Sequence, residues 1–289
     1  MTKKKAITVR LFGGLGNQFF QYFAGLELSN NSHLPLFLDF RWIESGYSHQ
    51  GSDLRDFRFA KNFASHDKNT SSSLNFRTEK LKTKLASNSK LMGELFSINS
   101  PVNPGFVELK PRESGIELRG YYQSYKYYEK NFNSQTMEDF SLLHESDLFQ
   151  ARKSELTNTP FIAVHVRGGD YLKKQNLYHK LDSDYYIKAI DLLRGVCGKF
   201  KVYVFSDDIE YAKDLLKEVR DATYVDEVGL RASDSLVLMS LGEGIVIGNS
   251  TFSYWSAVLN NGKNIIAPKF WYSNKHVDKY LYPSNWRVI

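Results

Sequence analysis

Residues 161–172 read FIAVHVRGGDYL, and this stretch decides the fold that we expect for the chain. Its first six residues form an almost continuous apolar run, which is typical of a strand buried on both faces of a parallel sheet. The run breaks at Arg167 into two glycines, Asp170 and Tyr171. Ligands of open α/β sheets bind at the carboxyl ends of the strands, so the break predicts a binding site as well as a strand end.

Strands and helices alternate on the C-terminal side of this stretch. The patterns predict helices over 182–197, 208–219, 232–241 and 251–262, and strands over 201–206, 223–227, 244–248 and 264–268. Asp182 or Ser183 is expected to cap the first of these helices, and Gly262 is expected to close the last. Short strands separated by helices are typical of βαβ units, so we predict an α/β domain built on a parallel sheet.

The N-terminal half starts with the same order of strand, glycine turn and helix. Residues 6–12 (AITVRLF) and 34–40 (LPLFLDF) predict strands, and a turn at 13–17 precedes a helix that we expect over 18–29. A chain of 289 residues is long enough for two hydrophobic cores. We therefore expect two domains.

The boundary between the domains is expected just before Pro160. Residues 116–132 predict a strand that runs into an aromatic-rich helix, and 133–158 read as a polar helical region. Pro160 breaks this helix before the apolar strand begins. The predicted domains are therefore 1–158 and 159–289.

Charge is distributed unevenly along the chain. The net charge is +6, and residues 61–92 supply most of it with seven basic residues against two acidic ones. Residues 61–100 are also rich in Ser and Asn, so we expect an exposed, mobile basic insertion there, within which TEKLKTKLA (78–86) could form a polar helix. A basic balance permits nucleic acid, an acidic membrane surface or a nucleotide phosphate as partner. The segment lacks the interleaved aromatic residues of a nucleic-acid site, so nucleic acid is not expected.

The sequence requires neither an oxidising compartment nor a membrane span. Cys197 is the one cysteine, so no intramolecular disulfide can form. Arg10 interrupts the apolar stretch near the N-terminus, which leaves it too short for a signal peptide. No segment approaches the roughly 20 apolar residues of a membrane-spanning helix. We expect a cytoplasmic protein whose basic face allows peripheral contact with the inner membrane.

Polar residues gather at the ends of three predicted strands and form a candidate anion site. An arginine suits two phosphate oxygens, and the amides at a helix N-terminus bind phosphate. The candidate residues are His165, Arg167, Asp170, Ser206, Asn249, Ser250, Thr251 and Phe252. A salt bridge between Arg167 and Asp170, and a plain N-cap at Ser250 or Thr251, are open alternatives.

Two further stretches contribute candidates. Asp234 stands near the start of a predicted helix, where a carboxylate is usually a cap but could accept both hydrogens of the guanine N1 and N2 edge. The GGLGNQ turn matches only half of a dinucleotide fingerprint, so a nicotinamide site is not expected. The seven histidines are scattered, and no metal site is predicted. The turn offers four residues to a ligand, namely Gly14, Gly16, Asn17 and Gln18.

Together these motifs resemble those of the bacterial GDP-fucose-dependent α-1,2-fucosyltransferases, glycosyltransferase family 11. The resemblance implies an α/β, GT-B-like fold in which two Rossmann-like domains face a central cleft. It also implies that the enzyme needs no metal and no cofactor beyond its GDP-fucose donor. The matching stretches run in the family's order over most of the chain: GGLGNQFFQY (13–22), LRGYYQSYKYY (118–128), HVRGGDY (165–171), DSLVLMSLGEGIVIGNSTFSYWSAVLN (234–260) and FWYSN…YPSNW (270–286).

The resemblance implies a role for each main candidate. The N-terminal domain would hold the acceptor, a galactose-terminated oligosaccharide or a lipid-linked glycan, and the C-terminal domain would hold the GDP-sugar. Arg167 would hold the β-phosphate, and His165 would contact the nucleotide. Asp234 would read guanine, and Asn17 would face the sugar. The amides and hydroxyls of 249–251 would bind the diphosphate.

The implied reaction is fucosyl transfer to a galactose 2-hydroxyl with inversion, from a β-linked donor to an α-linked product. Arg167 and the amides of 249–252 would stabilise the departing diphosphate. Asp39 is the candidate general base, because it should end a strand near the glycine turn. A helix cap, or a salt bridge from Asp39 to Arg41 or Arg55, is an open alternative.

Two departures from the family pattern bear on function. Gly168 stands where the family often has a second arginine, and Tyr254-Trp255-Ser256 replaces the usual tryptophan pattern. One cation is therefore missing on the donor side. Two alternatives stay open: a transferase for another GDP-sugar or linkage, and a nucleotide- or glycan-binding protein without turnover. Gly168 favours the second, and the intact set of Arg167, Asp234 and Ser250 speaks against it.

Overall fold

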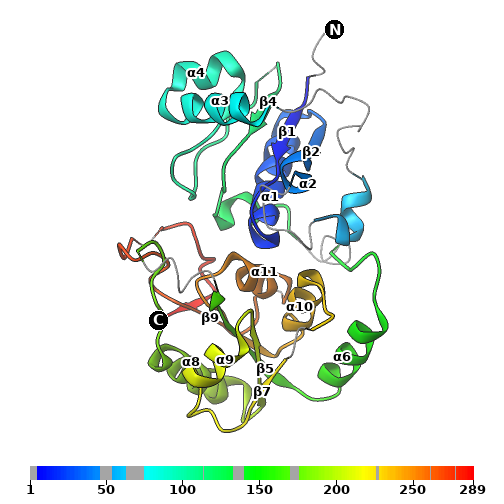
Figure 1. Cartoon of the computed structure of the whole chain (residues 1–289), viewed down its shortest axis with the longest axis vertical. Helices are drawn as coiled ribbons and strands as arrows, with labels where there is room; N and C mark the ends of the chain where they lie inside the picture. The colour runs from blue at the N-terminus through cyan, green and yellow to red at the C-terminus, as the bar shows by residue number, and fades with distance from the viewer. Residues whose placement is uncertain are drawn as a thin grey trace. The chain divides into compact units, whose positions relative to one another are not determined.

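The chain divides into two compact units, Met1–Phe140 and Ser141–Ile289 (Figure 1). The division falls before the boundary expected between 158 and 159, because helix α6 (Asp147–Thr157) packs against a helix of the second unit. The structure is a computed structural model. It describes residues 5–45, 54–62, 75–112, 114–132, 140–169, 176–225, 228–260, 262–276 and 278–289.

The first unit is built on a four-stranded parallel sheet with the strand order β2-β1-β4-β3. Its strands are β1 (Ile7–Arg10), β2 (Leu36–Asp39), β3 (Ile98–Asn99) and β4 (Ile116–Leu118). Its helices are α1 (Leu15–Ser32), α2 (Arg41–Glu44), α3 (Phe76–Asn88) and α4 (Lys90–Phe96), with short 3-10 turns η1 (Leu54–Asp56), η2 (Arg58–Asn62) and η3 (Tyr125–Tyr127).

An aromatic cluster forms the core of this unit beneath α1. Phe19 and Phe23 are fully buried on the helix, at the helical spacing that the sequence shows. The Phe23 ring stacks on Phe140 with a centroid distance of 5.7 Å, and the Phe19 ring meets Phe57 edge-on at 5.1 Å. Buried rings of this kind contribute both a large apolar area and a fixed geometry. The predicted helix over 18–29 is confirmed, and it extends further at both ends.

The described part of the expected basic insertion is ordered secondary structure. Residues 75–100 form α3, α4 and β3, and β3 pairs in parallel with β4. The side chains of Asn75 and Ser89 cap the two helices. This part of the insertion is therefore two capped helices and a strand instead of loops, and the polar stretch TEKLKTKLA (78–86) lies within α3. Residues 63–74 lie outside the described residues.

Two expected helices in the middle of the chain differ from the structure. The aromatic-rich segment within 116–132 forms only the 3-10 turn η3, and Tyr122 before it adopts a left-handed backbone with φ of 52°. A left-handed residue interrupts regular helix geometry. The helix expected over 133–158 starts at Asp147, where Ser146 accepts a hydrogen bond from the Phe149 amide at 3.2 Å. Residues 133–139 lie outside the described residues.

The second unit is built on a six-stranded sheet with the order β10-β9-β8-β5-β6-β7, in which every pair is parallel. Its strands are β5 (Phe161–Val166), β6 (Lys201–Ser206), β7 (Ala222–Tyr224), β8 (Gly244–Val246), β9 (Ile265–Ala267) and β10 (Arg287–Val288). Besides α6, its helices are α8 (Ser183–Cys197), α9 (Ile209–Leu215), α10 (Ala232–Met239) and α11 (Thr251–Leu259). The parallel α/β prediction is confirmed, while β10 was not predicted.

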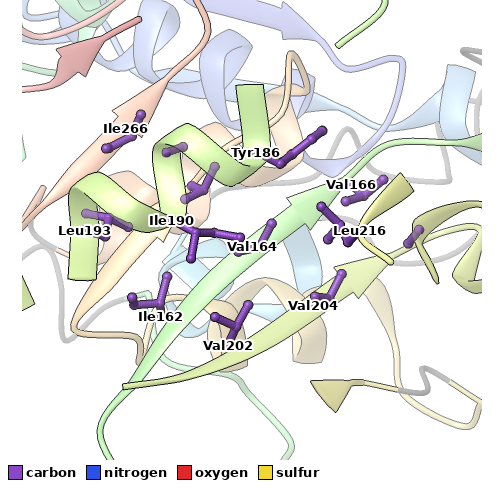
Figure 2. Close-up of a cluster of buried hydrophobic side chains, with 13 residues drawn as sticks. Ile162, Val164, Val166, Tyr186, Ile190, Leu193, Val202, Val204, Leu216 and Ile266 are labelled. Atoms are coloured by element: carbon purple, nitrogen blue, oxygen red, sulfur yellow. The ribbon is translucent and has the colours of Figure 1, made fainter. Parts of the chain in front are cut away.

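β5 lies at the centre of the main core of this unit. All six of its residues are buried, as its apolar sequence predicts. Figure 2 shows Ile162 and Val164 of β5 beneath Ile190 and Leu193 of α8, with Val204 from β6 alongside. Burying one such side chain contributes roughly 1.5–3 kcal/mol, so the position of β5 is firmly held.

Each sheet reverses its strand order at its first strand. In the second unit β5 has β6 on one side and β8 on the other, and in the first unit β1 has β2 on one side and β4 on the other. Figure 1 shows α8 with α9, and α10 with α11, on opposite sides of the second sheet. Open α/β sheets bind ligands at the carboxyl ends of the strands beside such a reversal. The fold therefore predicts one ligand-binding position in each unit, at the strand-order reversal of its sheet.

Candidate functional site

The ends of β5 and β8 lie against each other at the reversal in the second sheet. A Cβ atom added to Gly248, just after β8, would lie 3.1 Å from the His165 carbonyl oxygen. Phe252, in the first turn of α11, packs its ring against the His165 imidazole with a centroid distance of 5.4 Å. The N-terminus of α11 therefore begins beside the carboxyl end of β5. The structure brings these sequence-predicted residues together.

Arg167 is held by Asp207, a residue that sequence analysis did not select. Arg167 Nη1 lies 3.0 Å from Asp207 Oδ2, and Asp207 Oδ1 accepts a hydrogen bond from the Gly168 amide at 2.9 Å. Asp208 caps α9 by accepting a hydrogen bond from the Tyr211 amide at 3.1 Å. The pair Asp207-Asp208 thus separates into one positioning residue and one cap. The signal for this was the place of Asp207 directly after β6, the neighbour of β5.

The two glycines after Arg167 are required by close contacts. A Cβ atom at Gly168 would lie 2.6 Å from Asp208 Cβ, and one at Gly169 would lie 2.5 Å from Asp207 Oδ2. Gly169 also has a φ of +37°, which side chains rarely adopt. The loop is therefore shaped around the two aspartates. Asp170, the donor-site candidate whose salt bridge to Arg167 was an open alternative, lies outside the described residues.

His165 is buried and electrically neutral at ordinary pH. It is 2% exposed, and burial, followed by the positive charge of Arg167, lowers its pKa to about 3. Among the described residues its Nδ1 has no hydrogen-bond partner. A neutral imidazole can donate or accept a hydrogen bond but does not act as a general acid near pH 7.

The loop between β8 and α11 combines one cap with one structural clamp. Ser250 caps α11 by accepting a hydrogen bond from the Phe252 amide at 3.3 Å. Asn249 is buried, and its Nδ2 donates to the carbonyl oxygens of His179 at 2.7 Å and Trp271 at 3.0 Å. The Asn249 side chain therefore ties two loops together and does not itself face a ligand.

Thr251 and Ser206 occupy different surroundings. Thr251 is partly exposed in the first turn of α11, where an anion would meet the helix N-terminus. Ser206 is 3% exposed and closes a local turn, because its Oγ donates to the Asp208 carbonyl at 2.9 Å and accepts from the Asp208 amide at 3.0 Å. Ser206 therefore shapes the strand end and leaves ligand contact to its neighbours.

Asp234 is fully engaged by Arg231. Its Oδ1 lies 2.7 Å from Arg231 Nη2, and its Oδ2 accepts from Arg231 Nε at 3.1 Å and from the Arg231 amide at 2.9 Å. Arg231 Nη2 also donates to the His144 carbonyl at 2.6 Å. This is the capping role that sequence analysis left open. A ligand could reach both carboxylate oxygens only after the arginine side chain turns away.

The candidates of the glycine turn lie at the start of α1 in the first unit. Gly14 is the N-cap residue of α1, and Gly16 is buried in its first turn. Gln18 is 1% exposed and bridges the chain, since its Nε2 donates to the Gly13 carbonyl at 3.1 Å and its Oε1 accepts from the Leu54 amide at 3.2 Å. Gln18 therefore stabilises the turn. Its side chain does not face a ligand, although the sequence analysis expected it to do so.

Asn17 and Asp39 differ in exposure and in their partners. Asn17 is partly exposed, and its Oδ1 accepts a hydrogen bond from Gln123 Nε2 at 2.9 Å. Asp39 is fully buried at the end of β2, with Arg41 Nε 2.8 Å from Oδ1 and Arg41 Nη2 2.8 Å from Oδ2. Burial alone would raise the pKa of Asp39, but the hydrogen bonds and charge of Arg41 outweigh it and lower the pKa. This geometry speaks against the general-base role expected for Asp39.

Neither a metal-binding cluster nor a membrane-spanning helix is present in the described residues. No group of three or more His, Cys, Asp or Glu side chains in this part of the chain is placed to hold a metal ion. None of the described helices combines the length and apolar character needed to cross a membrane.

Sequence comparison decides the family of the chain. The model of the family described as Glycosyl transferase family 11 matches residues 59–289. The chain belongs to glycosyl transferase family 11. This family 11 protein is similar to the alpha-1,2-colitosyltransferase of Escherichia coli, with 27% identity over 95% of each chain. It is also similar to the O-antigen biosynthesis glycosyltransferase WbnK of Escherichia coli, with 26% identity over 93% of this chain and 96% of that protein.

Comparison with solved structures supports the fold. The family 11 chain matches the fucosyltransferase NodZ from Bradyrhizobium with a TM-score of 0.55 and 14% identity, covering 89% of this chain and 94% of NodZ. A second NodZ structure, an α-1,6-fucosyltransferase co-crystallized with GDP, matches with a TM-score of 0.52 and 12% identity over 89% and 93% of the two chains. The predicted α/β, GT-B-like fold is confirmed.

Proposed function

We propose that this family 11 glycosyltransferase is an inverting enzyme that moves L-fucose from GDP-β-L-fucose to the 2-hydroxyl of a terminal galactose. One observation carries the proposal: the carboxyl end of β5, which Arg167 directly follows, lies beside the N-terminus of α11 at the strand-order reversal of the second sheet. A cation and a set of helix-terminal amides suit a diphosphate. The GDP-bound NodZ structure of the same fold and the α-1,2 linkage made by the colitosyltransferase support the choice of donor and linkage.

The proposed chemistry depends on stabilising the leaving group. The acceptor oxygen attacks the anomeric carbon of fucose as the bond from that carbon to the GDP β-phosphate oxygen breaks. The departing diphosphate gains negative charge, which Arg167 and the amides at 250–252 would neutralise. Asp207 holds the guanidinium of Arg167 in place for this task. The neutral His165 beside them adds a hydrogen-bonding group without adding charge.

The acceptor proton needs a destination other than Asp39. Both Asp39 oxygens are bound by Arg41, and the lowered pKa makes the carboxylate a weak base. In the proposed reaction the proton therefore leaves late, to solvent or to a phosphate oxygen of the departing GDP. This route needs no protein base, since the charge that builds up on the diphosphate supplies one.

Guanine recognition by Asp234 requires a change at Arg231. The Arg231 side chain is 36% exposed and can turn into solvent, whereas Asp234 is 1% exposed and fixed in α10. We propose that a guanine base displaces the guanidinium and takes over its two hydrogen bonds to the carboxylate. Adenine presents no matching pair of donors, so this exchange would select GDP over ADP.

A second donor is favoured by one specific observation. The relative that covers 95% of this chain at 27% identity carries the name colitosyltransferase. Colitose differs from fucose in lacking the 3-hydroxyl group, and it would occupy the same position beside the diphosphate. The alternative function is therefore α-1,2 transfer of this deoxy sugar from its GDP donor. A binding protein without turnover is the remaining alternative, favoured only by the missing cation at Gly168.

The proposal is tested in two steps on the whole chain. Calorimetry with GDP and ADP should show binding of GDP alone, and Asp234→Ala should abolish it. Transfer to a terminal galactoside is then followed by mass spectrometry with GDP-fucose and GDP-colitose as competing donors, and NMR of the product reports the linkage.

Arg167→Gln should lower the rate of transfer about 10²–10³-fold. Arg194→Gln, in a surface ion pair of the same unit, is the matched control and should leave it unchanged. GDP binding without any sugar transfer would contradict the proposed enzyme and favour the alternative of a binding protein without turnover.

A further inference from the structure

The first unit contains a cavity at the strand-order reversal of its own sheet. Arg10 ends β1 and lines the cavity together with Phe12 and Gly13, which follow it. Arg119 and Tyr121 line it from the loop after β4, the neighbour of β1 on the other side from β2. The carboxyl ends of two adjacent parallel strands thus open into the cavity, at the position where an open α/β sheet holds its ligand.

The cavity has the size of a small-ligand site. Its volume is about 710 Å³, within the roughly 300–1,000 Å³ that is usual for pockets holding small molecules. Every described residue that lines it belongs to the first unit. Trp42 of α2 and one face of α3 complete the wall, the latter through Lys80, Thr83, Lys84 and Ser87.

Three aromatic rings form part of the wall, and Tyr121 is the most exposed of them. Phe12 and Tyr121 meet edge-on with a centroid distance of 5.0 Å, and Tyr121 is 41% exposed. The Trp42 ring meets Phe76 edge-on at 5.2 Å and lies under the Arg10 guanidinium, 5.4 Å from its centroid. The Tyr121 ring, supported by Phe12, is therefore the flat surface on which a ligand can pack.

The loop that carries Tyr121 is fixed by the two residues that follow it. Tyr122 is fully buried, and its hydroxyl oxygen lies 2.9 Å from both the carbonyl oxygen and Oδ1 of Asn99. Gln123 Nε2 donates a hydrogen bond to Asn17 Oδ1 at 2.9 Å. Because the loop is held before any ligand arrives, little ordering of Tyr121 has to accompany binding.

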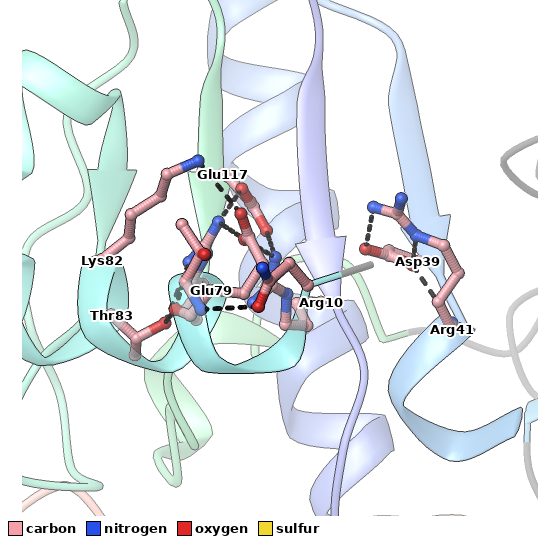
Figure 3. Close-up of polar contacts among 10 residues, drawn as sticks. Arg10, Asp39, Arg41, Glu79, Lys82, Thr83 and Glu117 are labelled. Atoms are coloured by element: carbon pink, nitrogen blue, oxygen red, sulfur yellow. Dashed lines mark hydrogen bonds and ion pairs between the residues drawn. The ribbon is translucent and has the colours of Figure 1, made fainter. Parts of the chain in front are cut away.

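A network of ion pairs fixes the floor of the cavity (Figure 3). Arg10 Nη2 lies 2.7 Å from Glu79 and 2.8 Å from Glu117. Arg119 Nη2 lies 2.7 Å from Glu79 and 2.6 Å from Glu117. Glu79 also pairs with Lys82 at 3.1 Å. Because these side chains bind one another, they hold α3 against the strand ends and so fix the shape of the cavity.

A flat aromatic ring selects sugars by the shape of their C–H faces. In galactose the axial 4-hydroxyl points to one side of the ring, so the C–H groups at positions 3, 4 and 5 form a continuous apolar face on the other side together with C6. In glucose the hydrogen at C4 lies on the opposite face, which interrupts this surface. An exposed tyrosine ring therefore packs more completely on galactose than on glucose.

We infer that this cavity holds the galactose ring of the acceptor and that Tyr121, supported by Phe12, packs on its apolar face. The inference rests on the proposed function, because the proposed transfer requires a site for a terminal galactose. It adds where this sugar is held and which side chain selects the galactose configuration.

Binding of simple glycosides to the whole protein, without donor, tests the platform. Ligand-observed NMR titrations compare methyl β-galactoside with methyl β-glucoside, and the galactoside should bind about tenfold more tightly. Tyr121→Ala should weaken galactoside binding about tenfold, whereas Tyr121→Phe keeps the ring and should retain the affinity within about threefold. Phe106→Ala is the matched control, since Phe106 is 39% exposed in the same unit and does not line the cavity; it should change nothing.

A second pair of variants tests the location without removing the ring. Lys84 and Lys90 are both exposed, but only Lys84 lines the cavity. Lys84→Trp should fill the cavity and abolish galactoside binding, whereas Lys90→Trp should leave it unchanged. Urea unfolding of each variant shows that the fold is retained, and Lys84→Trp decides the location if Tyr121→Ala fails to fold.

Equal affinity for the two glycosides would overturn the inference, as would wild-type binding in Tyr121→Ala or in Lys84→Trp. A loss in Tyr121→Phe as large as that in Tyr121→Ala would overturn the role of the ring. GDP affinity is measured in parallel. Absence of GDP binding with an intact preference for galactoside would count against the donor proposal alone, and GDP binding without that preference would count against this inference alone.

Discussion

Gly168 shows how a single residue can be mistaken for a lost function. Its family position often holds an arginine, so the missing cation favoured a binding protein without turnover. The structure gives a steric reason instead, because Asp208 Cβ and Tyr211 Cδ1 lie 2.6 Å and 3.1 Å from the position of a Cβ atom at residue 168. The glycine lets the chain pass between Asp207 and α9, and Asp207 then fixes the arginine that remains.

Gly168→Ala should therefore destabilise the protein, by about 1–3 kcal/mol. Urea unfolding measures the change. The matched control is Gly195→Ala in α8, where an added Cβ would meet nothing within 4 Å. Alanine in this helix should stabilise by about 0.5–1 kcal/mol. Equal effects of the two substitutions would refute the steric account of Gly168.

Asp207 should act on the rate through Arg167. Asp207→Asn keeps an oxygen for the Gly168 amide and removes the charge that holds the guanidinium. We expect kcat to fall roughly tenfold, less than the 10²–10³-fold typical of a lost transition-state contact. The fall in kcat is measured by steady-state kinetics, with the donor sugar that the wild-type protein is found to use. Asp221→Asn, in the ion pair with Arg194, is the control and should be silent. A kcat of Asp207→Asn equal to that of the wild type would contradict a role of Asp207 in positioning Arg167.

His165 should make stability depend on pH. Its folded-state pKa is about 3, against 6.5 for the ordinary side chain, so the unfolded chain binds a proton between these values that the folded chain does not. The stability that the neutral His165 contributes is complete above pH 6.5 and is lost as the pH falls. Between pH 7 and pH 5 the loss amounts to about 2 kcal/mol of unfolding free energy. Urea unfolding at both pH values should show this loss in the wild type and not in His165→Asn.

Several candidate site residues have side chains that are engaged within the chain, and they share one cause. Asn249, Gln18, Asp234 and Asp39 were selected as polar groups in suggestive positions, and each proved to have a partner within the chain. The partner of Asn249 lies 70 positions away, so no local pattern could reveal it. The positions of Arg167 after a buried strand and of Ser250 at a helix N-terminus were predictable, because both are local features.

At the scale of elements, the second unit was predictable and the middle of the chain was not. Apolar runs flanked by turn residues located β5, β6, β8 and β9. The strand β10 has two residues and depends on pairing with β9, which leaves no periodic signal. The helices α3 and α4 were obscured by polar composition. The ion pairs of Glu79 and the Asn75 cap hold α3 in place, and the Ser89 cap begins α4.

Glu79 should be the main anchor of α3. It accepts hydrogen bonds from Arg10, Arg119 and Lys82, and although burial would raise its pKa, these partners lower it to about 2. Glu79→Gln removes the charge that balances two buried arginines, so it should destabilise by about 3 kcal/mol. Thermal or urea unfolding measures it. Glu129→Gln, in an exposed pair with Lys126, should change stability by less than about 1 kcal/mol. Similar values for both would contradict an anchoring role.

At the scale of the molecule, each unit has its own sheet and its own core. Residues 141–289 alone should therefore fold, as a compact unit of this size generally can. Circular dichroism should show a single cooperative urea transition. GDP should raise its midpoint if the proposed donor site is complete in this unit. A broad, non-cooperative transition would show that the first unit is needed for folding, and a sharp transition without response to GDP would count against the donor site alone.

The division at Phe140/Ser141 also bears on how new specificities can arise. Every strand of each sheet comes from one continuous half of the chain. A single crossover in the gene at this point would exchange a complete half without cutting a sheet. Recombination between family members at this point would exchange whole folding units, so a chimera joined between residues 140 and 141 should keep both sheets intact.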